Sequence, residues 1–474
     1  MNGVDFKQIC FYNQIILLER VNNVKKNTAF QNIITILMGA LLFGLLWRVR
    51  GEHGWGSSWG LLNAGFVFTL FIIVIKGTRQ KLDLKHIALI AISFMFTTPG
   101  WGTLLNQITG VIYQPEDLSL GLETTYTSVG SAVFLMLCLG FGLASLFGIM
   151  LGKGFSAKEW KLRHFIVLLA VFYITDLIAS AFISPFILNA VQPEAAEVFE
   201  KGLALSEIDG SAYEVYLAHF KDVSWAKKIE GGRNYFQSAE AITSAIKTLT
   251  SILATRFIIK DKIAAKTGGV VCCAFAFGIT LADLFFYFGN GGYHMLNESY
   301  LPEFFYAWGC WEYFTGFIAG ALITAFIVFL KPEEDVGEIV FPKIPEKVKK
   351  VLIFVAGIIF LTGVNIVRPV MVRFEDSKAM IPAIIIAVLF AVGIVALLVK
   401  FFGFNAEKGD FKKFALILLF FFVAYINIVY LVVGTPDCIH LFGNFGFQHS
   451  MAIMSAGVIL IWLAFSKSGK VRLK

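Results

Sequence analysis

The sequence predicts an all-α, polytopic integral membrane protein with about 12 transmembrane helices. Of its 474 residues, 57% are hydrophobic and only 15% are charged, whereas a soluble protein of this size carries about 25% charged residues. Apolar runs of about 18 residues recur along the whole sequence, and such runs are typical of membrane-spanning helices. We therefore expect a single transmembrane domain over residues 1–474.

The apolar runs set the expected helices, and the longest polar stretches between them define the other parts of the chain. Residues 1–28 are expected to form a cytoplasmic N-terminal segment. Residues 191–234 mix acidic and basic side chains, so we expect an extracytoplasmic cap or lid loop there. Residues 331–349 are expected to form a cytoplasmic loop. The expected spans are residues 29–47, 60–76, 85–98, 127–151, 164–190, 235–257, 268–289, 304–330, 350–367, 380–401, 411–433 and 449–466.

The basic residues predict the orientation of these spans. Most of the 40 lysines and arginines lie in alternate connections, and cytoplasmic loops retain positive charge. This pattern places the N- and C-termini in the cytoplasm. The net charge of +7 then marks topology and contact with anionic lipids rather than a nucleic-acid partner. We expect a multi-pass protein of the cell membrane, either a bacterial inner membrane or a plasma membrane, with membrane lipids as partners.

One outward connection, RVRGEHGWGSSWG from Arg48 to Gly60, is unusually rich in chemistry. Arg48, Arg50, Glu52 and His53 fall within six residues. Guanidinium groups bind phosphate with directional, charge-assisted hydrogen bonds, and an imidazole near its ordinary pKa suits proton transfer. The structural alternative is that Arg48 extends toward lipid headgroups and that the tryptophans form an interfacial belt.

The other outward connections also concentrate polar side chains, whereas the inner ones are plain basic connectors. We therefore place the working site at the outer face, because loops on a rigid scaffold often carry function. The histidines lie on different loops and no cysteine spacing indicates a metal, so no metal or cofactor is expected. The candidate catalytic residues are His53, Glu52, His294 and Glu298. The candidate phosphate- or substrate-binding residues are Arg48, Arg50, Asn106, Asn290, Asn297, Glu312, Arg368, Arg373, His440 and His449.

Charged residues inside the spans predict a buried polar cavity. In the span 235–257, polar residues recur every three or four positions from Arg233 to Ser251, which places them on one helical face. A charge at the bilayer centre costs roughly 2.5–3.5 kcal/mol on insertion scales, so such residues normally pair. Asp176 and Lys247 are the expected partners, either as a functional pair or as a structural bridge. The candidate cavity residues are Asp176, Glu240, Lys247 and Asp283.

Several short motifs follow one another in a suggestive order along the chain. They are His53-Gly54, Gly289-Asn290 with Asn297-Glu298, Trp311-Glu312, and an outer arginine at Arg368 or Arg373. This order resembles prolipoprotein diacylglyceryl transferase, a membrane enzyme that moves a diacylglyceryl group from phosphatidylglycerol to a lipoprotein cysteine. Trp55 stands where that family's first motif has a second glycine. The resemblance implies a lipid donor and a polypeptide acceptor at the outer face.

Two functions from different classes are consistent with these features. The first is a membrane transferase that acts at the extracytoplasmic face on a lipid or lipid-linked donor and moves a phosphate-containing headgroup, a glycosyl unit or a diacylglyceryl unit to a lipid-linked or polypeptide acceptor. The alternative is a 12-helix secondary transporter or flippase for an anionic or lipid-linked solute. Asp176 and Lys247 near the midplane favour the transporter, as does Pro185, which is expected to interrupt its helix. The crowding of polar groups at one face favours the enzyme.

Overall fold

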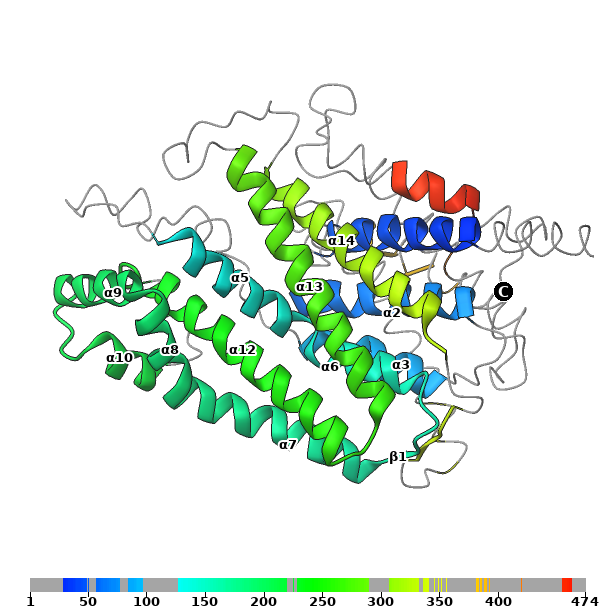
Figure 1. Cartoon of the computed structure of the whole chain (residues 1–474), viewed down its shortest axis with the longest axis horizontal. Helices are drawn as coiled ribbons and strands as arrows, with labels where there is room; N and C mark the ends of the chain where they lie inside the picture. Colours follow the sequence, from blue (N-terminus) through cyan, green and yellow to red (C-terminus); the bar gives the residue numbers. More distant parts are fainter. Residues whose placement is uncertain are drawn as a thin grey trace, which may run out of the picture.

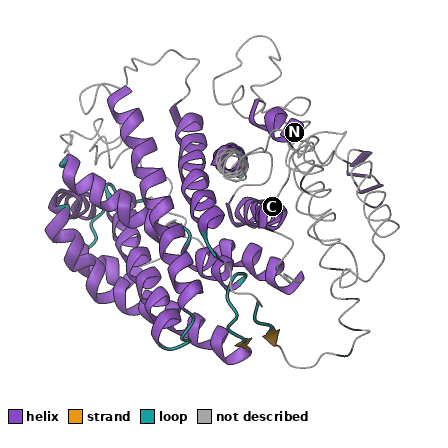
Figure 2. Cartoon of the chain, turned by 45° about the vertical axis from the view of Figure 1, so that its right-hand side comes forward, coloured by secondary structure: helices purple, strands orange, loops and turns teal. Residues whose placement is uncertain are grey.

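The computed structural model describes about half of the chain as an α-helical bundle. The described residues are 29–48, 50, 57–76, 84–96, 127–219, 225, 228–289, 307–331 and 336–340, together with scattered positions from 345 to 462, of which 454–462 form a helix. Figure 1 shows the helices packed side by side, and Figure 2 shows the short strands of a two-stranded sheet at one end of the bundle. The all-α class is confirmed in this part of the chain.

The helices follow the apolar runs of the sequence closely. After the helix Ala29–Arg48 come α2 (Ser57–Lys76), α3 (Leu84–Ser93), the short η1 (Phe94–Phe96), α5 (Val129–Leu143), α6 (Ser145–Lys153) and α7 (Leu162–Ile178). The π-helical η4 (Ala179–Ile183) and α8 (Ser184–Val191) continue α7. The remaining helices are α9 (Pro193–Leu205), α10 (Ala212–His219), α12 (Gly232–Phe257), α13 (Lys262–Gly289) and α14 (Ala307–Phe329). The strands are β1 (Trp160–Lys161) and β2 (Ile339–Val340).

Four of the described helices are long and apolar enough to cross a membrane. They are Ala29–Arg48, Leu162–Val191, Lys262–Leu284 and Trp311–Phe329. A fifth crossing results if α5 and α6, which meet at a 42° bend, form one broken span. The shorter apolar helices Gly60–Lys76 and His86–Phe96 occupy two further expected spans. The last four expected spans lie largely outside the described residues.

Glycines let the apolar helices approach closely. A methyl group added at Gly316 of α14 would collide with the Phe43 carbonyl oxygen, and one at Gly278 of α13 would lie 2.7 Å from the Thr315 carbonyl oxygen. Small residues at such crossings are typical of helices that associate within a membrane. The contacts also fix the register. Residues near 48 lie level with residues near 312, because Gly44 meets Tyr313 and Gly39 meets Thr324.

The polar helix α12 lies inside the bundle, where it packs against α5, α7 and α13 (Figure 1). Its buried side chains include Gln237, Ser244, Lys247 and Ser251, four members of the expected polar face, whereas Glu240 is half-buried. In contrast, α7 turns large apolar side chains such as Ile174 and Leu177 outward. An apolar perimeter around a polar interior is the arrangement expected for a protein surrounded by lipid.

The described connections that are rich in basic residues meet at one end of the bundle. Strand β1 pairs in parallel with β2, and the Trp160 indole donates a hydrogen bond to Asp261 over 2.8 Å. At the same end, the Lys76 ammonium donates to the carbonyl oxygen of Leu330 over 3.1 Å. Connections that the sequence assigns to one side of the membrane are therefore neighbours in the fold.

Helices α9 and α10 form a small cap on the opposite part of the bundle (Figure 1). Phe199 and Leu203 of α9 share a buried apolar cluster with Tyr216 of α10 and Tyr235 of α12. The rings of Tyr216 and Tyr235 are 5.7 Å apart in an edge-to-face arrangement. This cluster attaches α10 to the first turns of α12 and brings a tyrosine from the cap toward the bundle interior.

Candidate functional site

The first candidate site is a buried group of two arginines on one carboxylate. Arg48 Nη1 donates a hydrogen bond to Glu312 Oε2 over 2.7 Å, and Arg50 Nη2 lies 3.5 Å from Glu312 Oε1. Each of the three side chains is less than a tenth exposed. A planar guanidinium is well matched to a carboxylate, so Glu312 holds two guanidinium groups together at one end of the bundle.

An aromatic side chain lies next to this group. The Arg50 guanidinium lies 4.2 Å from the centre of the buried Trp47 ring, which is cation–π contact distance. Burial lowers the pKa of Arg50 to about 10, while Glu312 opposes this change. Arg50 therefore remains positively charged at neutral pH.

The structure brings together three of the predicted phosphate- and substrate-binding residues, namely Arg48, Arg50 and Glu312. The other outer-face candidates lie outside the described residues. These are Glu52, His53, Asn106, Asn290, His294, Asn297, Glu298, Arg368, Arg373, His440 and His449. The described site thus contains charged groups suited to an anion, and its expected acid–base residues remain predictions.

The second candidate site is the ion pair of Asp176 and Lys247. The Lys247 ammonium donates to Asp176 Oδ1 over 2.9 Å, and both side chains are less than a tenth exposed. The same ammonium lies 4.8 Å from the centre of the Phe172 ring. The predicted partnership of Asp176 with Lys247 is therefore confirmed. Its local cause is the antiparallel packing of α7 on α12, because Thr250 also donates a hydrogen bond to Thr175 over 3.2 Å.

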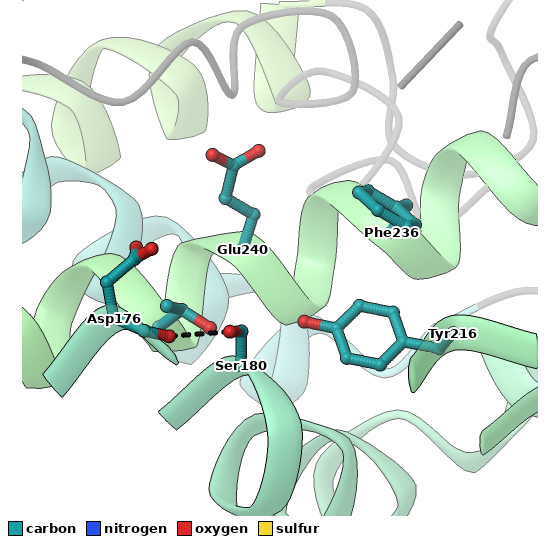
Figure 3. A pocket seen from close by; sticks show the side chains of 6 residues that line it. Asp176, Ser180, Tyr216, Phe236 and Glu240 are labelled. Atoms are coloured by element: carbon teal, nitrogen blue, oxygen red, sulfur yellow. Dashed lines mark hydrogen bonds between the residues drawn. The ribbon is translucent and has the colours of Figure 1, made fainter. Parts of the chain in front are cut away.

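A small pocket opens next to this ion pair. It is lined by Asp176, Ser180, Tyr216, Phe236, Glu240 and Thr243. Figure 3 shows the Tyr216 hydroxyl pointing toward Ser180, whose own hydroxyl is directed at the main-chain carbonyl oxygen of Asp176, with the carboxyl groups of Asp176 and Glu240 above them in this view. Thr243 also shares a hydrogen bond of 2.7 Å with Ser184. Side chains from α7, η4, α10 and α12 therefore meet in one polar pocket.

The pocket residues Tyr216, Phe236 and Thr243 were not predicted from the sequence. Thr243 carried a signal, since it lies three positions after Glu240 and four before Lys247, the spacing of one helical face. Tyr216 carried none, because only the docking of α10 on α12 brings it inward. Burial raises the pKa of the Tyr216 phenol, which therefore stays neutral and able to donate a hydrogen bond.

Asp283 does not line this pocket, although it was predicted to share one cavity with Asp176 and Glu240. Its side chain is fully buried on α13, and neither carboxyl oxygen has a hydrogen-bond partner among the residues that the structure describes. Its helix packs against α14, where Gly278 meets Thr315 and Ala319. This register places Asp283 near the level of Glu312.

Among the residues that the structure describes, no three histidine, cysteine, aspartate or glutamate side chains are placed to hold a metal ion. When the chain is compared with protein-family models, curated proteins and solved structures, nothing matches. The function must therefore be inferred from the two polar sites themselves.

Proposed function

We propose that the chain is an integral membrane transferase that acts at the extracytoplasmic face on a lipid or lipid-linked donor with a phosphate group. The observation that carries this proposal is the buried group of Arg48, Arg50 and Glu312. Two guanidinium groups held by one carboxylate form a rigid, directional pair of donors. Such a pair is suited to a phosphate or pyrophosphate at the lipid–water boundary.

The proposed reaction uses the arginines to stabilise the leaving group. A nucleophilic atom of the acceptor attacks the transferred unit, the bond to the donor's phosphate oxygen breaks, and the electron pair stays on that oxygen. Arg48 and Arg50 stabilise the negative charge that develops there, the kind of preorganised electrostatic contribution that dominates many enzymes. His53 or His294, oriented by Glu52 or Glu298, takes the proton from the acceptor.

The orientation of the chain is part of the same proposal. We propose 12 spans with both termini in the cytoplasm, because basic residues favour the cytoplasmic side. The meeting of Trp160 with Asp261 and of Lys76 with Leu330 at one end of the bundle supports this topology. The end of α14 near Leu330 then lies on the cytoplasmic side. Because the helix Ala29–Arg48 runs antiparallel to α14, Arg48 lies at the extracytoplasmic end.

Mass spectrometry of lipids, glycolipids and lipoproteins tests the transferase directly. Wild type, Arg50→Ala, Arg50→Lys and His53→Ala would be expressed in a bacterial host at matched membrane abundance. We expect a product in wild type that falls by about 10²–10³-fold in Arg50→Ala, as when one transition-state donor is removed. The matched control is Arg256, an exposed arginine in the last turn of α12. Arg256→Ala should retain the product. Wild-type product levels in both Arg50→Ala and His53→Ala would refute the proposal.

The alternative function is a secondary transporter, and a separate observation favours it. Asp176 lies at the middle of the 30-residue span Leu162–Val191, which is interrupted by the π-helical η4 just before Pro185. Interrupted helices and charged pairs near the midplane are common in carriers. Uptake of candidate anionic solutes into proteoliposomes, lost in both Asp176→Asn and Lys247→Met, would favour this function over the transferase.

A further inference from the structure

The ion pair of Asp176 and Lys247 lies where charges are most costly in a membrane protein. Asp176 is central in its 30-residue span, and Lys247 is close to the middle of the 26-residue helix α12. Charged residues at such depth are normally retained because they serve ion, proton or substrate movement. The pair therefore requires an explanation beyond the packing of α7 on α12.

The helix that carries Asp176 changes its geometry beside the pocket. After Ile178 the chain adopts a π-helical turn, in which the Ser184 N–H donates to the carbonyl oxygen of Ala179. The Ser180 hydroxyl, which lies within this turn, donates to the carbonyl oxygen of Asp176 over 2.5 Å. Single π-helical turns within α-helices occur frequently at functional sites. This turn places a hydroxyl group at the edge of the pocket.

The size and chemistry of the pocket limit what it can hold. Its free space suits about one water-sized ligand, which excludes a sugar, a lipid headgroup or an amino acid. Its polar lining consists of the carboxyl groups of Asp176 and Glu240 and the hydroxyl groups of Ser180, Thr243 and Tyr216. Hard cations prefer oxygen ligands of these kinds. A small cation is therefore the best match in both size and chemistry.

We propose that this pocket is a mid-membrane binding site for one small monovalent cation, either Na⁺ or a proton, and that the Lys247 ammonium is its built-in competitor. Lys247 already lies 2.9 Å from Asp176 and on the same side of α12 as Glu240, seven positions earlier. An incoming cation shares the two carboxylates with this ammonium. Among the residues that the structure describes, the charged or titratable groups around the site are Asp176 of α7, Glu240, Lys247 and Tyr235 of α12, and Tyr213 and Tyr216 of α10.

The cap contributes to the same site. Tyr216 comes from α10 and is almost fully buried, with its ring 5.3 Å from that of Phe236. Tyr213 of the same helix lies 3.5 Å from the carbonyl oxygen of Ala181 in the π-helical turn. The cap therefore covers the pocket on the side where α12 begins. This arrangement is independent of the proposed transferase chemistry at Arg48 and Arg50.

Thermal unfolding of the purified full-length protein in lipid nanodiscs tests the site, with NaCl exchanged for choline chloride at constant ionic strength and at pH 6 and pH 8. A ligand that binds the folded state raises the unfolding midpoint. We expect Na⁺ to raise the midpoint of wild type at pH 8 and to do so less at pH 6, where protons compete. Asp176→Asn and Glu240→Gln should lose this effect, and Lys247→Met should bind Na⁺ at least tenfold more tightly because its competitor is gone.

The outcomes separate the two cations and the two proposals. If a proton is the only ligand, Na⁺ has no effect, and the midpoint instead changes between the two pH values in wild type but not in Glu240→Gln or Asp176→Asn. The control Glu197→Gln, in an exposed pair of the cap, should behave as wild type. If Na⁺ and pH change the unfolding midpoint of wild type no more than those of Asp176→Asn and Glu240→Gln, the cation site is overturned. Cation binding without any lipid product would retain this site and reject the transferase.

Discussion

Arg48 and Glu312 form a buried hydrogen-bonded ion pair of 2.7 Å although they are 264 positions apart in the sequence. The contact joins the end of the helix Ala29–Arg48 to the second turn of α14. It also gathers Arg50 onto the same carboxylate. A local feature of one loop thereby becomes a fixed site shared by two helices.

Removal of this carboxylate should destabilise the protein strongly. In Glu312→Gln, two buried guanidinium groups lose their shared anion, and breaking a buried pair in this way costs about 3–5 kcal/mol. Unfolding of the purified protein in detergent measures the loss. The exposed pair Glu197–Lys201 provides the control, because Glu197→Gln should cost less than about 1 kcal/mol. Equal losses in the two variants would contradict the buried pair.

Replacement of both partners should be milder than replacement of one. The double variant Arg48→Met with Glu312→Leu removes the shorter of the two ion pairs and leaves only the Arg50 guanidinium without its carboxylate, and apolar replacement of a buried pair is often close to neutral. We expect it to recover at least about half of the stability lost in Glu312→Leu alone, as a double-mutant cycle would measure. Additive losses would mean that the two side chains do not interact.

Gly278 and Gly269 of α13 provide a matched test of helix packing. A methyl group at Gly278 would lie 2.7 Å from the Thr315 carbonyl oxygen, whereas at Gly269 it would meet nothing within 4 Å. Gly278→Ala should therefore separate α13 from α14 and cost about 1–3 kcal/mol. Gly269→Ala should be neutral or stabilising by up to about 1 kcal/mol, since alanine favours the helix. A larger loss of stability in Gly269→Ala than in Gly278→Ala would show that α13 and α14 do not pack as described.

The connection before α13 depends on a single aspartate. Asp261 Oδ1 accepts the Ala264 N–H over 2.9 Å, and Oδ2 accepts the Trp160 indole N–H over 2.8 Å. Asp261→Ala removes both interactions and should cost about 2–3 kcal/mol in an unfolding experiment. Ser128→Ala, which removes an exposed cap of α5, should cost only about 1 kcal/mol. A loss in Asp261→Ala no larger than in Ser128→Ala would argue against the link between the two connections.

Periodicity was sufficient to predict much of the bundle, because it depends on neighbours in sequence. The helical run 235–257 and the pairing of Asp176 with Lys247 followed from spacing and from the cost of buried charge. The 42° bend between α5 and α6 was not predicted: the expected span 127–151 contains no proline, and the break falls at Ala144 between leucine and serine. Short glycine- and serine-containing segments can bend a helix without interrupting its apolar pattern.

The two candidate sites show the same division between features that the local sequence predicts and features that depend on tertiary packing. Arg48, Arg50 and Glu312 were each singled out because charged residues next to a span are unusual, yet their mutual contact depends on the register between two helices far apart in sequence. Tyr216 was not predicted at all. Its inward position results from the docking of α10 on α12, and an exposed tyrosine in a loop would have the same local sequence. Tertiary packing therefore decides which predicted polar residues become neighbours.

The sidedness of the bundle tests the central claim most directly, because the transferase requires Arg48, Arg50 and Glu312 at the extracytoplasmic end. Single cysteines would replace Glu197 in the cap and Lys161 in β1, both exposed, in a background without the six native cysteines. Labelling with a membrane-impermeant maleimide then reports which end faces outward. We predict that Glu197→Cys is labelled in intact cells and that Lys161→Cys is labelled only after permeabilisation. The reverse pattern would place the arginine–glutamate group in the cytoplasm and contradict the proposed function.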